Sequence, residues 1–261
     1  MKIFPLILNL ILLVSCSSND IVESDNNFEV TLIATTTTVA IDEPYSINVT
    51  APENIKTIGV SLDNFVTTIG NSSLNFGNST TLNFNFDTLG QKTISIKAIN
   101  ENNRVSIKQL NVTVIRGNAI KITGVKVVSF YNINTTWDPE YAASNTNRLA
   151  DVFFSFIKNS LNTPYNITNS YKNWYKSTVK TNQGDLLWDL SDKNIYCKPS
   201  TVLRFGLTDE DDPPLGQDLL NGFPDYREIN FNDYSVAKPS IITYTNPNIN
   251  LQIQFTVDWV N

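Results

Sequence analysis

The sequence contains no histidine and only two cysteines, Cys16 and Cys197. Histidine is the commonest general base and a frequent zinc ligand, so its absence disfavours most hydrolase mechanisms and zinc sites. Basic residues are also few: 19 Lys and Arg against 25 Asp and Glu give a formal net charge of -6. Because phosphate binding requires a concentrated basic surface, we expect no binding of nucleic acid. A positively charged partner such as a metal ion fits this charge better.

Long helix-forming runs of Ala, Glu, Lys and Leu are also missing, whereas Asn, Thr, Ser, Ile and Val are abundant. These preferences favour strands and turns over helices. The composition, 41% hydrophobic and 17% charged, is that of a globular protein, and 261 residues exceed what one β-sandwich needs. We therefore expect an all-β chain with two β-sandwich domains in series.

The N-terminus has the pattern of a signal peptide, with Lys2 followed by a mostly apolar stretch over residues 3–14. This stretch is shorter than the roughly 20 residues that span a bilayer. The following Leu-Val-Ser-Cys, ending at Cys16, resembles the lipobox of bacterial lipoproteins. The resemblance implies cleavage after residue 15, lipidation of Cys16 and anchoring of the chain to the outer membrane of the cell envelope.

Residues 17–27 are polar and acidic, which predicts that residues 16–27 form a lipidated, flexible tether. The acidic residues Asp20, Glu23 and Asp25 resemble the surface-export signals of Bacteroidetes lipoproteins. This resemblance implies that the anchored protein faces outward.

Residues 28–117 alternate apolar and polar positions, as in Leu82-x-Phe84 and Ile94-x-Ile96. Period two indicates half-buried strands, and about seven of them describe an immunoglobulin-like sandwich. The apolar residues Val105 and Ile107 have odd numbers, whereas the apolar residues that follow, Leu110, Val112 and Val114, have even numbers. This change in the alternation predicts a bulge near residues 108–109. Residues 89–100 resemble the closing half of PKD and related Ig-like repeats, although the Trp-Asp-Phe-Gly-Asp-Gly signature of those families is missing. The resemblance implies only the Ig-like architecture, and we expect this domain to be a plain spacer.

Residues 118–261 predict a second sandwich of eight strands. Its clearest strand is the last, where Leu251, Ile253, Phe255, Val257 and Trp259 alternate with polar residues. The remaining strands are predicted near residues 120–131, 152–157, 171–179, 186–190, 202–207, 227–231 and 241–244. Cys197 is predicted to be a small buried residue with a structural role.

An acidic loop in this second domain is the strongest candidate for a site. It contains Asp209, Glu210, Asp211 and Asp212, followed by Asp218. Alternate residues of an extended chain point the same way, so Asp209 and Asp211 can converge on one cation. Carboxylate oxygens without His or Cys favour calcium, with magnesium second. Pro213 and Pro214 exclude an EF-hand, and a solvated turn is the alternative.

Residues 205–211 and 218–222 resemble the third calcium loop of C-two domains, and residues 151–156, together with Trp137-Asp138, resemble parts of the first. The loop between Asp138 and Asp151 is longer than is usual in that family. The resemblance implies an eight-stranded C-two-like sandwich that binds Ca²⁺. It implies five ligands: Asp138, Asp151, Asp209, Asp211 and Asp218.

These features favour a lipid-anchored binding or adhesion protein of the cell surface, with the membrane and an unidentified protein or glycan as partners and with no catalytic residue. A carbohydrate-binding protein is one alternative, in which Trp137, Tyr141, Trp174 or Tyr175 would stack on sugars. An envelope hydrolase or a structural subunit is another. Ser-x-x-Lys occurs at Ser155 and at Ser177, but the companion motifs of serine β-lactamases are missing. Carboxylate pairs of glycoside hydrolases are spatial and leave no sequence spacing.

Overall fold

The computed structural model describes residues 28–68, 70–72, 75–163, 166–211 and 216–260. The predicted signal peptide, Cys16, the tether and Asp212 to Pro214 of the acidic loop lie outside these residues. The described chain consists of strands and four short 3-10 turns, so the prediction of an all-β protein with β-sandwich domains is confirmed. In the part of the chain that is described, no helix is long and apolar enough to cross a membrane.

The first domain packs a three-stranded sheet on a five-stranded one around a core that extends from Phe28 to Ala119. Its buried positions include the alternating Leu82, Phe84, Ile94 and Ile96, as the period-two pattern predicts. The smaller sheet has the order β1 (Thr31–Ala34), β3 (Tyr45–Thr50), β6 (Ser79–Phe84). The larger sheet has the order β2 (Thr38–Ala40), β8 (Val105–Ile115), β7 (Gly90–Asn100), β4 (Ile55–Ser61), β5 (Gly70–Ser72).

The predicted bulge near residues 108–109 is wrong. Strands β7 and β8 pair in one continuous register, in which Lys108 is opposite Ile96 and Gln109 is opposite Ser95. The two apolar residues that suggested the bulge, Val105 and Ile107, face solvent instead, with exposed fractions of 38% and 53%. Isolated apolar residues are common on protein surfaces, so the change in alternation of apolar residues did not indicate a bulge.

The second domain packs two five-stranded sheets around a separate core from Ile120 to Val257. Aromatic rings fill its centre, where Phe205 contacts Phe154, Phe156 and Phe255. One sheet contains β11 (Asn166–Lys176), β10 (Val152–Thr163), β14 (Leu203–Glu210), β15 (Gly216–Asp218) and β16 (Arg227–Ile229). The other contains β12 (Leu187–Asp189), β13 (Tyr196–Cys197), β9 (Ile120–Ser129), β18 (Leu251–Asp258) and β17 (Ile241–Asn246).

Strands occur at each of the eight places predicted in this domain. Two further strands, β13 and β15, bring the number in the described residues to ten rather than eight. They have two and three residues, which is too short for any periodicity to show. The four 3-10 turns, η1 to η4, cover Thr146–Arg148, Thr181–Gln183, Phe231–Tyr234 and Pro247–Ile249.

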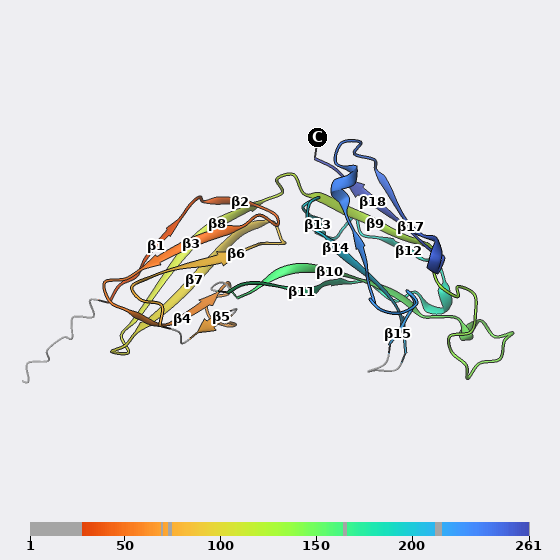
Figure 1. The fold of residues 1–261 in the computed structure, drawn as a ribbon, viewed down its shortest axis with the longest axis horizontal. Coiled ribbons are helices and arrows are strands. Elements are labelled where there is room, and N and C mark those ends of the chain that lie inside the picture. Colours follow the sequence, from red (N-terminus) through yellow and green to blue (C-terminus); the bar gives the residue numbers. More distant parts are fainter. Residues whose placement is uncertain (1–27, 69, 73–74, 164–165, 212–215, 261) are drawn as a thin grey trace, which may run out of the picture.

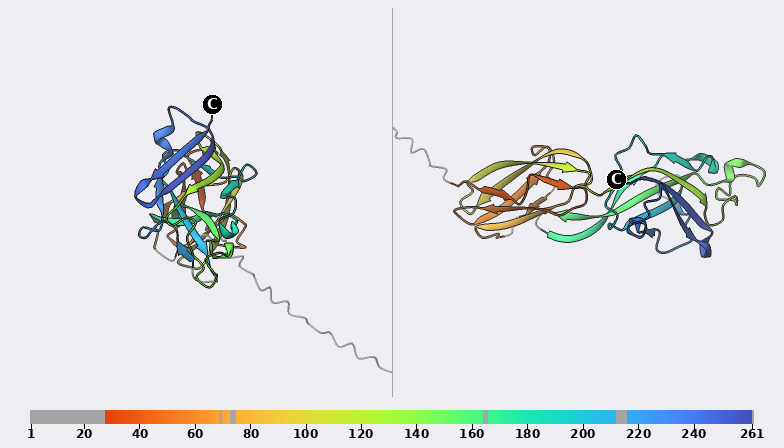
Figure 2. Two further views of the ribbon diagram at one scale, coloured as in Figure 1. Left: turned by 90° about the vertical axis from the view of Figure 1, so that its right-hand side faces the viewer. Right: turned by 90° about the horizontal axis from the view of Figure 1, so that it is seen from above.

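The two domains follow one another along the longest axis of the molecule (Figure 2). A tight turn joins β8 to β9, and within it Gly117 has φ +59. A Cβ at this glycine would lie 2.5 Å from the Cβ of Ala40, so the turn requires a residue without a side chain. The guanidinium of Arg116 then donates to a carboxylate oxygen of Asp258, 3.0 Å away, at the end of β18.

A two-stranded ribbon forms a second connection between the domains. Beyond Lys158, where pairing with β14 ends, β10 continues to Thr163 and pairs only with β11 among the described residues. Figure 1 shows this ribbon running beneath the junction toward the first domain. At its base the Lys158 ammonium forms an ion pair, with a distance of 2.7 Å, with Asp42 of the β2–β3 turn.

Candidate metal centre

Asp209 is a carboxylate buried near the end of β14, with an exposed fraction of 1%. The strand holds it between two neighbours, because Asp209 is paired with Val152 on β10 and with Gln217 on β15. One carboxylate oxygen, Oδ1, accepts a hydrogen bond of 2.6 Å from the backbone N–H of Asp151. The other, Oδ2, is buried without a hydrogen-bond partner. A buried carboxylate oxygen in this state is destabilising unless something compensates its charge.

Two further aspartates bring their carboxylates to the same place. Single carboxylate oxygens of Asp138, Asp209 and Asp211 all lie within 4.8 Å of one another. Asp211 follows β14 directly, two residues after Asp209, as the alternation of extended chain predicts. Asp138 belongs to the long loop between β9 and β10, where the N–H of Asp138 donates to the carbonyl of Arg148 at 3.2 Å.

Arg148 fixes the shape of that long loop from within. Its Nε donates to the carbonyl of Ala143 at 2.7 Å, and its Nη1 donates to the carbonyl of Asn134 at 3.1 Å. The loop therefore has a hydrogen-bonded frame that presents Asp138 to the end of β14, although 71 positions of sequence numbering separate Asp138 from Asp209.

The electrostatics of the group oppose three simultaneous negative charges. Burial, opposed by the hydrogen bond from the N–H of Asp151 and assisted by the charges of Asp211, Asp138 and Asp151, raises the pKa of Asp209 to about 6. Burial also raises the pKa of Asp138, with additional contributions from the charges of Glu140, Asp211 and Asp151. Like charges at this separation favour either a bound proton or a bound cation.

Asp151, the fourth predicted ligand, lies beside the group but has a structural partner. Its Oδ1 accepts a hydrogen bond of 2.7 Å from the N–H of Asn182, and its own N–H contacts Asp209. It lines the same cavity as Asp138 and Asp211. Asp151 can therefore orient Asp209 and the Asn182 turn while remaining close to any bound ion.

Asp218, the fifth predicted ligand, is not brought into the group. Its Oδ1 accepts from the N–H of Leu220 at 2.8 Å and its Oδ2 accepts from the N–H of Gly222 at 2.6 Å. Both oxygens cap the turn that follows β15. Its pairing partner in the sheet is Thr208, one residue before Asp209. Close sequence spacing to the other aspartates did not translate into proximity of the carboxylates.

Asp138 and Asp211 of this group line a cavity of about 370 Å³. Sequence reasoning missed four of its lining residues: Asn147, Thr181, Asn182 and Glu140. The first three come from turns η1 and η2, which meet only in the folded chain. Glu210 is partly neutralised by Lys176, whose Nζ lies 2.9 Å from Oε1. The cavity thus surrounds the carboxylates with amide and hydroxyl groups.

This donor set suits a hard divalent cation. It offers carboxylate oxygens and nearby amide oxygens, with no histidine in the chain, and such oxygens are the ligands of calcium and magnesium. With one oxygen from each carboxylate, the group supplies three of the six to eight oxygens typical of calcium, so a bound ion would retain positions for water or a ligand.

The aromatic residues considered as sugar platforms have different surroundings. Trp137, Trp174 and Tyr175 are partly buried and pack against the core of the second domain. Tyr141 is 39% exposed and lines the cavity beside the aspartates.

The two Ser-x-x-Lys patterns lie in β10 and in the extended segment after β11. Lys158 of the first is paired with Asp42. Ser177 of the second is buried, and its hydroxyl accepts from the N–H of Phe154 at 2.9 Å. Cys197 is fully buried, as predicted, and burial raises the pKa of its thiol to about 12.

No family model matches this chain, and no curated protein matches it in sequence. Solved structures with similar folds include the PKD domain of an M14-like peptidase from a Thermoplasmatales archaeon, with 20% identity, a TM-score of 0.28 and coverage of 34% of this chain and 96% of that one. The fibronectin(III)-like modules of CbhA from Clostridium thermocellum give 10% identity, a TM-score of 0.27 and coverage of 72% and 88%. A CARDB domain from Pyrococcus furiosus, solved in complex with di-metal ions, gives 17% identity, a TM-score of 0.24 and coverage of 34% of this chain and 86% of that one. At these TM-scores and identities, none of them bears on what this chain binds.

Proposed function

We propose that this chain is a lipid-anchored binding or adhesion protein of the cell envelope. In this proposal Asp138, Asp209 and Asp211 bind a calcium ion, which orders the loops of the second domain that contact the ligand. The observation that carries the proposal is the buried Oδ2 of Asp209, which has no hydrogen-bond partner and belongs to a group of three carboxylates. A cation would compensate this oxygen and the repulsion among the three charges at once.

Calcium fits the site better than magnesium. Magnesium demands a near-ideal octahedron of ligands at short distances, whereas calcium accepts six to eight oxygens in flexible arrangements. Here the ligands come from the end of one strand and from a long loop, with a wide cavity beside them. Such an arrangement suits the larger and less demanding ion. In this role the second domain acts as a C-two-like calcium-binding sandwich.

The two domains have separate tasks in this proposal. The chain enters the first domain at β1, at the end away from the second domain, whereas the long loop between β9 and β10 lies at the opposite end of the molecule (Figure 1). Lipidation of Cys16 would fix the first end at the outer membrane of a Bacteroidetes-type envelope. The PKD-like first domain would then hold the calcium-ordered loops away from the membrane.

Calorimetric titration of the purified protein with calcium chloride tests the metal site. The parent is expected to bind one ion, and Asp209→Asn is expected to abolish binding. Asp218→Asn is the matched control, because it removes an acidic charge from the same loop without touching the group of three. Equal effects of the two substitutions, or no heat from the parent, would refute the proposed site.

Melting curves give an independent measure of the same site. Calcium at 100 times its dissociation constant should stabilise the parent by about 2.7 kcal/mol relative to EGTA.

Anchoring is tested separately by Cys16→Ser, which should move the protein from the membrane fraction to the soluble fraction of the cell envelope. Retention of this variant in the membrane fraction would contradict lipid anchoring without affecting the calcium site.

A further inference from the structure

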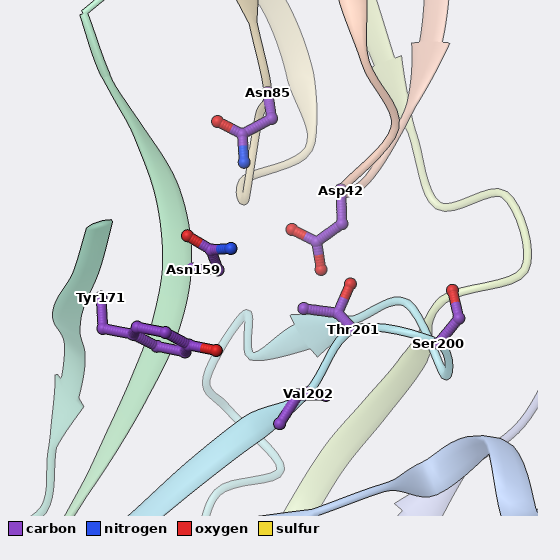
Figure 3. A pocket seen from close by; sticks show the side chains of 7 residues that line it. All are labelled: Asp42, Asn85, Asn159, Tyr171, Ser200, Thr201 and Val202. Atoms are coloured by element: carbon purple, nitrogen blue, oxygen red, sulfur yellow. The ribbon is translucent and has the colours of Figure 1, made fainter. Parts of the chain in front are cut away.

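A second cavity, of about 320 Å³, lies at the junction of the two domains and shares no lining residue with the cavity beside the aspartate group. Figure 3 shows the side chains that line it. Three segments distant in sequence contribute: the turns of the first domain, the β10–β11 ribbon, and the loop between β13 and β14. Its lining includes Asp42, Asn85, Asn159, Tyr171, Thr201 and Val202.

The walls of this cavity are held in place by hydrogen bonds between the domains. Asp42 stands in a turn with φ +59, and its N–H donates to the carbonyl of Phe86 at 3.0 Å. Its carboxylate bridges to the second domain, with Oδ1 accepting from the Lys158 ammonium at 2.7 Å and Oδ2 accepting from the N–H of Lys198 at 3.0 Å. The first-domain wall is thereby fixed to the second domain.

The opposite wall is also ordered. Asn159 and Tyr171 are direct cross-strand partners in the ribbon. The guanidinium of Arg204 lies 3.2 Å from the centroid of the Tyr171 ring and forms an ion pair with Glu228. In Figure 3 the carboxylate of Asp42, the amides of Asn85 and Asn159 and the hydroxyl of Thr201 converge on a common space.

One polar atom of this wall is unsatisfied. The side-chain oxygen Oδ1 of Asn159 is buried without a hydrogen-bond partner. This oxygen points toward the ribbon, whereas the amide nitrogen of Asn159 faces the cavity (Figure 3). The Asn159 amide is therefore a hydrogen-bond donor to an occupant of the cavity.

Charge balance at the cavity favours an uncharged ligand. The Asp42 carboxylate is compensated by Lys158, and the Lys198 ammonium is paired with Glu43 at 2.7 Å. An anion would therefore find neither of these lysines free, and a cation would find the carboxylate already occupied. The groups that remain are amides and hydroxyls, which exchange hydrogen bonds equally well with neutral donors and acceptors.

We propose that this junction cavity is a binding site for a small, neutral, polyhydroxylated compound of the size of a single sugar unit. The volume lies at the lower end of the range of ligand pockets, which begins at about 300 Å³. Hydroxyl groups of an occupant can accept from the Asn159 amide nitrogen and can exchange hydrogen bonds in both directions with the Thr201 hydroxyl. Because both domains line the cavity, an occupant would also stabilise their relative orientation.

Saturation-transfer NMR on the purified full chain tests this site, with glucose, galactose, mannose and N-acetylglucosamine as probes. At least one sugar is expected to receive saturation from the parent, equally in calcium and in EGTA. Thr201→Val and Asn159→Leu keep the side-chain size and are each expected to weaken binding about tenfold, the equivalent of one hydrogen bond. If either variant has a clearly lower melting temperature than the parent, Tyr171→Phe, which loses only a hydroxyl, is used in its place.

Thr243→Val is the matched control, because Thr243 is exposed on the edge strand β17 and remote from the cavity. It should bind as the parent does. Transfer to none of the four sugars, or transfer that survives the cavity substitutions, would overturn the proposal. Transfer that disappears in EGTA or in Asp209→Asn would also overturn it, by assigning the sugar to the aspartate site.

Discussion

The ammonium of Lys158 lies 2.7 Å from a carboxylate oxygen of Asp42, and both side chains are only 4% exposed. The two residues belong to different domains and are separated by 116 positions. Lys158 also lies 4.0 Å from the centroid of the Trp174 ring, which adds a cation–π contact. The junction between the domains is therefore a buried ionic contact in addition to the chain connection at Gly117.

Lys158→Met should lower the free energy of unfolding by about 3 to 5 kcal/mol, because it leaves the Asp42 carboxylate buried without its counter-charge. Urea denaturation followed by circular dichroism measures the change. Lys193→Met is the control: Lys193 pairs with Asp192 on the surface, with side chains 49% and 70% exposed, and its loss should leave the midpoint near that of the parent. Equal shifts for the two variants would show that the buried pair adds nothing.

Gly117→Ala should destabilise the protein more than Gly77→Ala. Both glycines have positive φ, +59 and +63, so each substitution carries the backbone strain of about 1–2 kcal/mol. Only at Gly117 would the new Cβ also collide with Ala40, whereas nothing lies within 4 Å of a Cβ at Gly77. Thermal melting of both variants isolates the steric contribution of the domain turn. A larger loss at Gly77 would contradict this account.

Asp209 should make the calcium-free protein less stable as pH rises. Its folded-state pKa of about 6 is above the ordinary 3.8, so the folded chain holds its proton more tightly than the unfolded chain. The resulting stability is fully present below 3.8 and is lost as pH rises through about 6. The groups that oppose its ionisation are Asp211, Asp138 and Asp151.

Melting temperatures measured across this pH range in EGTA check the effect by difference. The parent should lose stability relative to Asp209→Asn as pH rises, since the amide cannot ionise. Saturating calcium should remove the loss, because the cation stabilises the ionised carboxylate. A parent-to-variant difference that stays constant with pH would show that Asp209 does not titrate in this window.

The Cys197 thiol should be unreactive in the native protein. It is fully buried, and burial raises its pKa to about 12, so almost no thiolate exists at neutral pH. In a Cys16→Ser chain, a colour-forming disulfide reagent should release no product until guanidinium chloride unfolds the protein, and then one equivalent. Rapid reaction of the native chain would show that β13 opens readily.

Local pattern determined most of the strands. Alternation along Leu251–Asp258 predicts β18 and its buried face, because a pleated strand places every second side chain on one side of the sheet. The same rule places Asp209 and Asp211 together at the end of β14. The rule failed for Val105 and Ile107, because alternation shows which residues are apolar but does not show which of them the fold buries.

Tertiary structure decided which of the predicted ligands meet and where a second cavity forms. Asp218 is close in sequence to Asp209 but uses both oxygens to cap a turn, whereas Asp138 is distant and joins the group because the Arg148-framed loop returns to β14. The pair of Asp42 with Lys158, and the cavity beside it, depend on how the ribbon meets the first domain. Periodicity is encoded by neighbours within a few residues, whereas these contacts arise only when loops bring distant segments together, and no local pattern records that closure.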